Sequence, residues 1–355
     1  MDRYWSDRVR QLHPYVPGEQ PRDQPFIKLN TNENPYAPSP RVISAIKDCA
    51  DARLRLYPDP ESNALRDTIA ASLEVGRENV FVGNGSDEVL ALTFQAFFSG
   101  TGSLLFPDIS YSFYPVYCGL FGIEPRQIPL ADDFSLDLRP YLNSAREGNA
   151  GIIFPNPNAP TSIALGLGAI TELLEKNSDS VVVIDEAYVD FGADTAVPLC
   201  ARFPNLLVTR TLSKSGSLAG MRVGYAVGHE GLIQALTRIK DSFNSYPIDV
   251  LAQAAAQAAI EDSAYFSEIC QRIISTRNRS AEALTELGFT VCDSSANFLF
   301  VTHQDRDAAD LAVQLREQGI LVRHWTSPRI AQYLRITVGT DDEMHQLIEV
   351  LHKCL

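Results

Sequence analysis

Short apolar runs alternate with amphipathic segments through the first two thirds of the chain. Runs such as "VVVI" at 181–184 contain consecutive apolar, often β-branched residues, which is typical of strands buried on both faces of a sheet. Strands are predicted at 79–83, 103–107, 151–155, 180–184, 205–208 and 223–227, and helices at 64–73, 86–98 and 168–176. Strands that alternate with helices indicate an α/β fold with a mostly parallel sheet covered on both faces.

The pattern changes near residue 245. An alanine-rich helix is predicted at 249–263 and a long charged helix at about 262–287; strands follow within 289–303, 320–325 and 333–339, and helices at 307–319 and 341–355. This order of elements predicts a smaller α+β unit.

The N-terminal residues carry another composition. Residues 11–40 are dense in proline and asparagine and contain one short strand-like piece at 26–30, which suits an extended arm. We therefore expect an arm over 1–50 that packs on the small domain, a large domain over 51–245 and a small C-terminal domain over 246–355.

Charge and composition exclude several classes of protein. Acidic residues outnumber basic ones 44 to 30, and the net charge of −14 argues against nucleic acid or an anionic membrane as a partner. No apolar run approaches the roughly 20 residues that span a bilayer. The six cysteines have no paired spacing and the N-terminus is polar, so we expect a cytoplasmic protein with small-molecule partners. We expect no metal site.

Polar side chains follow the ends of the predicted strands, where ligands bind in open α/β sheets. The residues at these ends are Gly83, Asn84, Gly85, Ser86, Asp87, Asp108, Ser110, Tyr111, Asn156, Asn158, Asp185, Tyr188, Thr211, Ser213 and Lys214. Together the strand ends supply a helix N-terminus, aromatic rings, amides, a carboxylate and an amine.

Each of these features has an ordinary structural explanation when it is taken alone. The "VGNGSDE" turn is either a plain helix cap or an anion site, and it is no dinucleotide fingerprint because Glu88 replaces the third glycine. Taken alone, Tyr111 and Tyr188 are explained by packing in the protein interior, and Lys214 is explained by exposure to solvent. Taken together, however, they match the needs of pyridoxal phosphate (PLP), which requires a lysine for a Schiff base, a carboxylate for its ring nitrogen and anion binders for its phosphate.

Six motifs make the chain resemble the fold-type I, PLP-dependent aminotransferases. They are "LNTNENPYAPSP", "YPDPESNALRDTIA", "VGNGSDEVL", "IDEAYVDF", "RTLSKSGSLAGMRVGY" and "YLRITVGT", and they cover essentially the whole chain in order. With the "PYVPGEQP" arm, they are most similar to the subfamily that transaminates histidinol phosphate with 2-oxoglutarate. The resemblance implies a mostly parallel seven-stranded sheet between helices, a smaller α+β domain, and a homodimer with shared active sites.

The resemblance also implies roles for individual residues. Lys214 would form the Schiff base and move the proton, Asp185 would pair with the ring nitrogen, and Tyr188 would bond the phenolic oxygen of the ring. Tyr111 would stack on the ring, and the phosphate would be held by Gly85, Ser86, Asp87, Ser213 and Arg222. Tyr57 would reach the phosphate in the other subunit. Arg335 would bind the substrate carboxylate, and Arg323 and Tyr15 would face a distal phosphate.

One stretch departs from the family pattern. The family usually has Asn-Pro-Thr-Gly after the strand at 151–155, whereas this chain has Ala159 before the proline and Ser162 in place of the glycine. We expect Asn158 to supply the missing amide through a shifted turn.

Other functions remain open at this point. An aromatic aminotransferase or a threonine-phosphate decarboxylase would share every cofactor residue and differ only in the substrate pocket. A nicotinamide-dependent dehydrogenase would also use strand ends and a glycine-rich turn, but it gives Lys214 and Arg222 no role.

Overall fold

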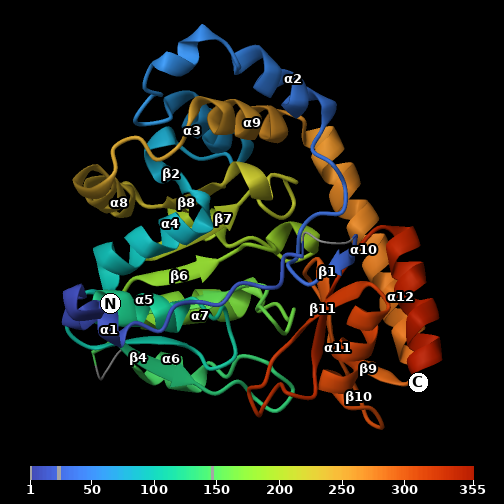
Figure 1. Cartoon of the computed structure of the whole chain (residues 1–355). Helices are drawn as coiled ribbons and strands as arrows, with labels where there is room; N and C mark the ends of the chain where they lie inside the picture. Colours follow the sequence, from blue (N-terminus) through green and yellow to red (C-terminus); the bar gives the residue numbers. More distant parts are fainter. Residues whose placement is uncertain (1, 22–24, 145–147) are drawn as a thin grey trace.

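A seven-stranded sheet forms the centre of the larger part of the molecule (Figure 1). The computed structural model describes residues 2–21, 25–144 and 148–355. The strand order is β2-β8-β7-β6-β5-β3-β4, and β8 alone runs antiparallel to its neighbours. The strands are β2 (Val80–Asn84), β3 (Ser103–Pro107), β4 (Glu124–Ile128), β5 (Gly151–Pro155), β6 (Val182–Asp185), β7 (Leu206–Thr211) and β8 (Val223–Gly228).

Six of these strands are the apolar runs that the sequence pattern predicts. The seventh, β4, was not predicted from its own residues, because four of its five residues, "EPRQ", are polar or proline and exposed. It lies at the edge of the sheet and pairs through hydrogen bonds with β3 alone. The mostly parallel α/β architecture itself is confirmed.

Helices cover both faces of this sheet. One face packs against α4 (Gly85–Thr93), which continues as a π-helical turn at Phe94–Phe98, and against α5 (Tyr114–Phe121) and α8 (Glu230–Phe243). The other face packs against α2 (Pro40–Cys49), α3 (Asn63–Ser72), α6 (Arg139–Ser144), α7 (Leu167–Lys176) and α9 (Val250–Glu261). Since both faces are covered, the strands are apolar throughout, which explains why the sequence shows runs rather than alternation.

A second sheet of five strands lies beside the first, in the order β1-β11-β12-β10-β9. These strands are β1 (Ile27–Leu29), β9 (Phe289–Val291), β10 (Phe298–His303), β11 (Ile320–His324) and β12 (Leu334–Thr337). The helices α10 (Ser263–Glu286), α11 (Ala308–Glu317) and α12 (Asp341–Cys354) pack with them around a separate core. A short helix, α1 (Asp7–Gln11), lies near the N-terminus, far from this sheet (Figure 1).

The N-terminal segment connects the two sheets. Its strand β1 pairs parallel with β11, so the predicted strand at 26–30 joins the C-terminal sheet. The alanines of α9, by contrast, are buried in the core of the large sheet although they follow residue 245. The division at 50 and 245 remains a prediction, and α9 attaches the start of the proposed C-terminal domain to the large core.

Within the described ranges, no helix is both long enough and apolar enough to cross a membrane.

Candidate active site

The carboxyl ends of β2, β3, β5, β6 and β7 meet at two adjoining cavities. The first, here called the lysine cavity, has a volume of about 120 Å³ and is lined by Ser86, Asp87, Tyr111, Pro155, Ala159, Asp185, Ala187, Tyr188, Thr211, Ser213, Lys214 and Arg222. The second, the arginine cavity, has a volume of about 330 Å³, and its lining includes Tyr15, Asn30, Thr31, Asn32, Arg323, Trp325 and Arg335. Both are also lined by Tyr111, Ala159, Tyr188 and Lys214, which form the boundary between them.

Lys214 follows the end of β7 in a turn of small residues. Its Nζ donates a hydrogen bond of 3.1 Å to the carbonyl oxygen of Thr31, and Asn34 Nδ2 holds the carbonyl oxygen of Lys214 at 3.0 Å. Burial, reinforced by the positive charge of Arg335, lowers the pKa of Lys214 to about 8. At pH 7 about a tenth of this amine is therefore uncharged, against well under a thousandth at the ordinary pKa of 10.5, and the uncharged form is the one that acts as a nucleophile or base.

Asp185 is the last residue of β6 and is almost completely buried. Its Oδ2 accepts a hydrogen bond of 3.1 Å from the hydroxyl of Tyr114, whereas its buried Oδ1 has no hydrogen-bond partner within the described part of the chain. Burial raises the pKa of Asp185 to about 6, against the smaller opposing effect of the Tyr114 bond. A buried carboxylate oxygen with no partner is suited to the N–H of a bound heterocycle.

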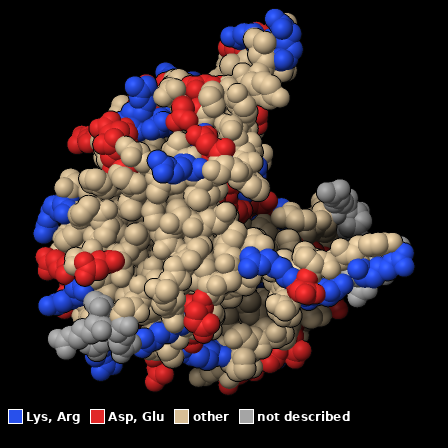
Figure 2. Space-filling view, turned by 90° about the vertical axis from the view of Figure 1, so that its left-hand side faces the viewer, with Lys and Arg blue, Asp and Glu red and all other residues tan. Residues whose placement is uncertain are grey.

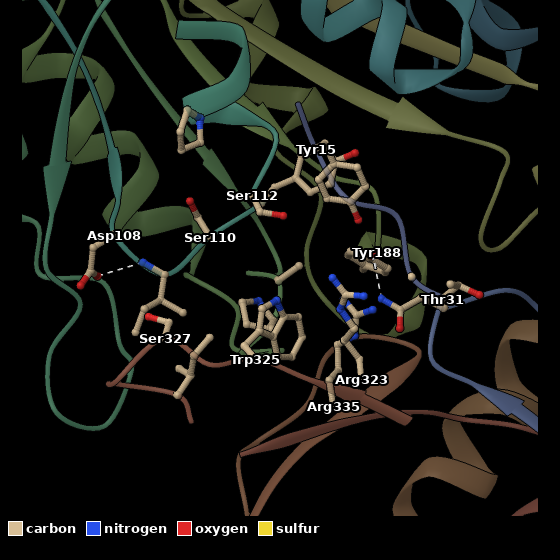
Figure 3. Close-up of a pocket in the computed structure, with 18 of the residues that line it drawn as sticks. Tyr15, Thr31, Asp108, Ser110, Ser112, Tyr188, Arg323, Trp325, Ser327 and Arg335 are labelled. Carbon is tan, nitrogen blue, oxygen red and sulfur yellow. Dashed lines mark hydrogen bonds between the residues drawn. The ribbon is translucent and has the colours of Figure 1, made fainter. Parts of the chain in front are cut away.

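Tyr188 is fixed by a residue that sequence reasoning did not single out. Asn32 Nδ2 donates to the Tyr188 hydroxyl oxygen at 2.9 Å, the bond drawn as a dashed line at Tyr188 in Figure 3. Asn32 Oδ1 in turn accepts a bond of 3.0 Å from the hydroxyl of Thr337. Because the Tyr188 oxygen accepts from Asn32, its own proton is free to point into the cavity. Asn32 lies in the quoted "LNTNENPYAPSP" motif, so the only available signal was the motif as a whole.

The start of α4 offers an anion site. No side chain caps this helix, and a Cβ on Gly85, at φ +76°, would lie 2.4 Å from Arg222 Nη2. The Asp87 carboxylate already accepts bonds of 2.8 Å from both Arg222 and the Tyr111 hydroxyl, and Arg222 also lies 3.5 Å from Ser213 Oγ. The first backbone N–H groups of α4 and the guanidinium of Arg222, which Asp87 holds in place, lie side by side, and this arrangement is suited to a phosphate.

Two arginines face each other in the arginine cavity. Arg323 and Arg335 are paired directly across β11 and β12, and their guanidinium carbons lie 5.6 and 5.3 Å from the centroid of the Trp325 ring (Figure 3). Arg335 donates to the carbonyl oxygen of Asn30 at 2.9 Å, while its buried Nε has no partner among the described residues. Burial and the charge of Arg323 lower the pKa of Arg335. Tyr15 packs on the Phe113 ring above the same space. This end of the cavity is suited to an anion.

Three predicted site residues line neither cavity: Gly85, which precedes Ser86 at the start of α4, and Asn158 and Tyr57, which lie elsewhere. Asn158 Nδ2 instead donates to Ile109 O at 3.0 Å and to Thr161 Oγ1 at 2.8 Å, beside a separate cavity of about 80 Å³. Ala159, and not Asn158, stands on the wall of the lysine cavity, and a cofactor role for Asn158 stays a prediction. Tyr57 is 81% exposed and stacks on Tyr246 with 4.6 Å between ring centroids.

The described residues contain no group of three or more His, Cys, Asp or Glu side chains that could hold a metal ion.

Comparison with known proteins identifies the family. The model of the aminotransferase class I and II family matches residues 24–351. This chain belongs to the class I and II aminotransferases. The family resemblance inferred from the motifs is thereby confirmed, and a nicotinamide-dependent dehydrogenase is excluded.

Individual aminotransferases resemble the chain along its whole length. It is 58% identical to histidinol-phosphate aminotransferase 2 of Dechloromonas aromatica, over 99% of each chain, and 60% identical to histidinol-phosphate aminotransferase 2 of Thiobacillus denitrificans, over 98% of this chain and 97% of the relative. Among solved structures, the histidinol-phosphate aminotransferase of Sinorhizobium meliloti in complex with pyridoxal-5'-phosphate superposes with a TM-score of 0.84 at 25% identity, covering 94% of this chain and 92% of that one.

Proposed function

We propose that this protein is a PLP-dependent aminotransferase that transfers the amino group of L-histidinol phosphate to 2-oxoglutarate, giving imidazole-acetol phosphate and L-glutamate. The observation that carries the proposal is the placement of the Lys214 amine on the wall between a cavity that fits PLP and a cavity with two facing arginines. The names of the relatives at 58 and 60% identity support the same substrate.

The lysine cavity fits PLP by the chemistry of its donors and acceptors. Asp185 Oδ1, which has no partner within the described residues, would accept the N–H of the pyridine ring, and the Tyr188 hydroxyl would donate to its phenolic oxygen. The start of α4, with Ser86, Ser213 and Arg222, would hold the phosphate, and the Tyr111 ring would cover one face. When bound, PLP supplies an electron sink that stabilises negative charge on the α-carbon of the amino donor.

Lys214 would act as both the covalent anchor and the proton carrier. Its pKa of about 8 leaves the amine able to take a proton near neutral pH and to return it. The hydrogen bond from Nζ to Thr31 O directs the amine toward the boundary of the two cavities. A proton at the α-carbon of a substrate in the arginine cavity would therefore be within reach of Lys214.

The arginine pair would bind the anionic group of either substrate. In histidinol phosphate the phosphate is attached to the carbon next to the amine-bearing carbon, which is where an amino acid has its carboxylate. Because Arg323 and Arg335 lie directly opposite each other, we propose that they share this one anion, in place of the separate carboxylate and distal phosphate expected from the sequence. Tyr15 lies at the same end of the cavity and would contact the phosphate as well.

We also propose a homodimer in which Tyr57 enters the partner's site. Figure 2 shows a broad surface with few charged side chains, on the side of the molecule where α4 and α8 lie in Figure 1. Leu54, Leu56, Tyr57, Phe243 and Tyr246 are large apolar or aromatic residues that are each more than two fifths exposed. An exposed apolar patch of this kind is typical of an oligomer interface. We also propose that the protein works in the reducing cytoplasm, where its free cysteine thiols would stay reduced.

A panel of amino donors tests the proposed reaction. Histidinol phosphate, phenylalanine, tyrosine and threonine phosphate are compared by kcat/KM with 2-oxoglutarate as acceptor. Histidinol phosphate should give the highest value by at least about tenfold, since discrimination of that size needs only about 1.4 kcal/mol. A higher value for phenylalanine would favour the aromatic aminotransferase, and release of carbon dioxide from threonine phosphate would favour the decarboxylase.

A further inference from the structure

One ion pair connects the two sheets across the mouth of the arginine cavity. Arg329 lies in the loop 325–332, between β11 and β12, and its Nη1 donates to Asp108 Oδ2 at 2.6 Å. Asp108 directly follows β3 of the large sheet. The same guanidinium donates through Nη2 to the carbonyl oxygens of Leu130 at 2.8 Å and Ala131 at 3.3 Å. A single side chain thus makes three contacts with the other half of the molecule.

The Asp108 carboxylate, which accepts the bond from Arg329, is held in place by two other hydrogen bonds. Asp108 Oδ1 accepts the backbone N–H groups of Ile109 and Leu130, both at 2.9 Å. These two bonds fix the carboxylate, so that Oδ2 is presented toward the loop. The Arg329 side chain is 36% exposed and the Asp108 side chain 23% exposed, so solvent reaches the pair and its strength is that of a partly exposed ion pair.

The same loop builds one wall of the arginine cavity. Trp325, Ser327 and Ile330 line it, and Ser327 lies beside Asp108 while Trp325 lies between them and the two arginines (Figure 3). Ile330 is buried in a small cluster with Ile109, and His324 closes the base of the loop through a 2.8 Å contact between Nε2 and Ala331 O. Displacing the loop would therefore displace the Trp325 ring.

We propose that Arg329 is a positioning residue: by pairing with Asp108 it holds the 325–332 loop so that Trp325 supports the guanidinium groups that bind the substrate anion. The ring lies within cation–π distance of both Arg323 and Arg335, and it supports two like charges that have no carboxylate partner among the described residues. Loss of the pair loosens the loop and weakens anion binding, while the reacting atoms around Lys214 are untouched. This inference rests on the proposed function only in taking the ligand to be a phosphate-bearing substrate.

The test compares Arg329→Gln and Arg329→Lys in the holoenzyme with Arg306→Gln as the matched control. Arg306 is an exposed arginine of the same C-terminal half, with no hydrogen bond or ion pair in the described structure. All variants carry Trp5→Phe, because the chain has two tryptophans and Trp325 is then the one tryptophan excited selectively over the 13 tyrosines at the long-wavelength edge of the absorption band. Three quantities are measured: hydrogen–deuterium exchange of residues 325–332, the Kd of inorganic phosphate from Trp325 emission, and the steady-state KM and kcat.

Arg329→Gln should speed exchange of the loop and raise the phosphate Kd, each by about two- to fivefold, the range expected for a partly exposed ion pair. The KM for histidinol phosphate should rise by a similar factor, while kcat changes by less than about twofold. Arg329→Lys, which keeps the charge, should restore part of the effect, and Arg306→Gln should change nothing. Asp108→Asn removes the other partner of the ion pair and should also weaken phosphate binding. The double variant of Asp108→Asn and Arg329→Gln should bind phosphate only slightly more weakly than either single variant, because both changes break the same pair.

Unchanged exchange and an unchanged phosphate Kd in Arg329→Gln would overturn the proposal. A fall in kcat with no change in KM or in phosphate affinity would overturn it as well, since Arg329 would then act on the chemical step. If the unmodified enzyme fails to turn over histidinol phosphate, the proposed reaction is wrong, but the exchange and phosphate measurements still decide whether the loop is held by Arg329.

Discussion

Replacing Asp185 with asparagine should change the stability of the cofactor-free protein and its affinity for PLP in opposite directions. In the cofactor-free chain the carboxylate is buried with one hydrogen bond to Oδ2 and none to Oδ1 within the described residues. Its pKa is raised from 3.8 to about 6 because burial disfavours the charged form. The folded protein therefore loses stability from this group as the pH rises through about 6.

The size of the effect follows from the shift in pKa. A rise in the pKa from 3.8 to about 6 corresponds to about 3 kcal/mol of unfolding free energy lost at pH 7.5, and this loss disappears below about pH 4, where the carboxyl is protonated in both states. Asp185→Asn removes the charge and keeps an oxygen for Tyr114, so the cofactor-free variant should be more stable by up to about 3 kcal/mol. The same variant loses a charge-assisted bond to the pyridine N–H, worth about 1.5 to 3 kcal/mol, so the Kd of PLP should rise by about ten- to 150-fold.

Both effects can be measured on the purified protein. Urea unfolding of the cofactor-free protein at pH 4 and pH 7.5 gives the stability difference, and absorbance titration gives the PLP affinity. Asp190→Asn is the control, because the Asp190 carboxylate is paired with Arg210 and accepts the hydroxyl of Ser215 at 2.6 Å. That variant should destabilise the cofactor-free protein. If Asp185→Asn is no more stable than the unmodified protein at pH 7.5, or binds PLP equally well, the reasoning about the unpartnered oxygen is refuted.

Three further predictions concern other parts of the site. In the cofactor-free protein, acylation of Lys214, followed by peptide mass spectrometry, should increase through about pH 8, since the uncharged amine predominates above its lowered pKa; a midpoint near 10.5 would contradict the effect of burial. Arg335→Ala should lower kcat/KM for all amino donors by about 30- to 5,000-fold, the equivalent of about 2 to 5 kcal/mol, and Arg323→Ala should also lower it for every donor, because the two guanidinium groups share one anion; a loss on Arg323→Ala that is confined to histidinol phosphate and spares phenylalanine would disprove the shared site. Tyr57→Phe should raise the Kd of PLP and leave the sedimentation of the dimer unchanged, and a protein that sediments as a monomer before any mutation would disprove shared sites.

The fold was predictable where burial leaves a strong signal. Strands such as β6 and β7 are covered on both faces, so their apolar runs identify them from sequence alone. Strand β4 has no such run because its hydrogen bonds to β3, and not burial of its side chains, hold it in place. The packing of α9 on the core of the large sheet could not be predicted from sequence either, because a face of alanines can pack against either of the two cores.

The candidate site was predictable where a residue stands directly at a strand end. Asp185 and Lys214 satisfy this condition, and the structure brings them to one cavity. Asn32 was missed because it reaches Tyr188 from the N-terminal segment, 156 residues away in the sequence. The position of Asn158 beside a separate cavity could not be predicted, because the turn that holds it depends on contacts with Ile109 and Thr161, which no local sequence pattern reports.

The central claim is that the Lys214 amine holds PLP between the two cavities. Reduction of the holoenzyme with borohydride fixes the cofactor to the amine that carries it, and peptide mapping then identifies the residue. We expect the pyridoxyl group on Lys214 in stoichiometric yield and none on Lys214→Ala. Labelling of Lys176 or Lys240 in its place would contradict the account.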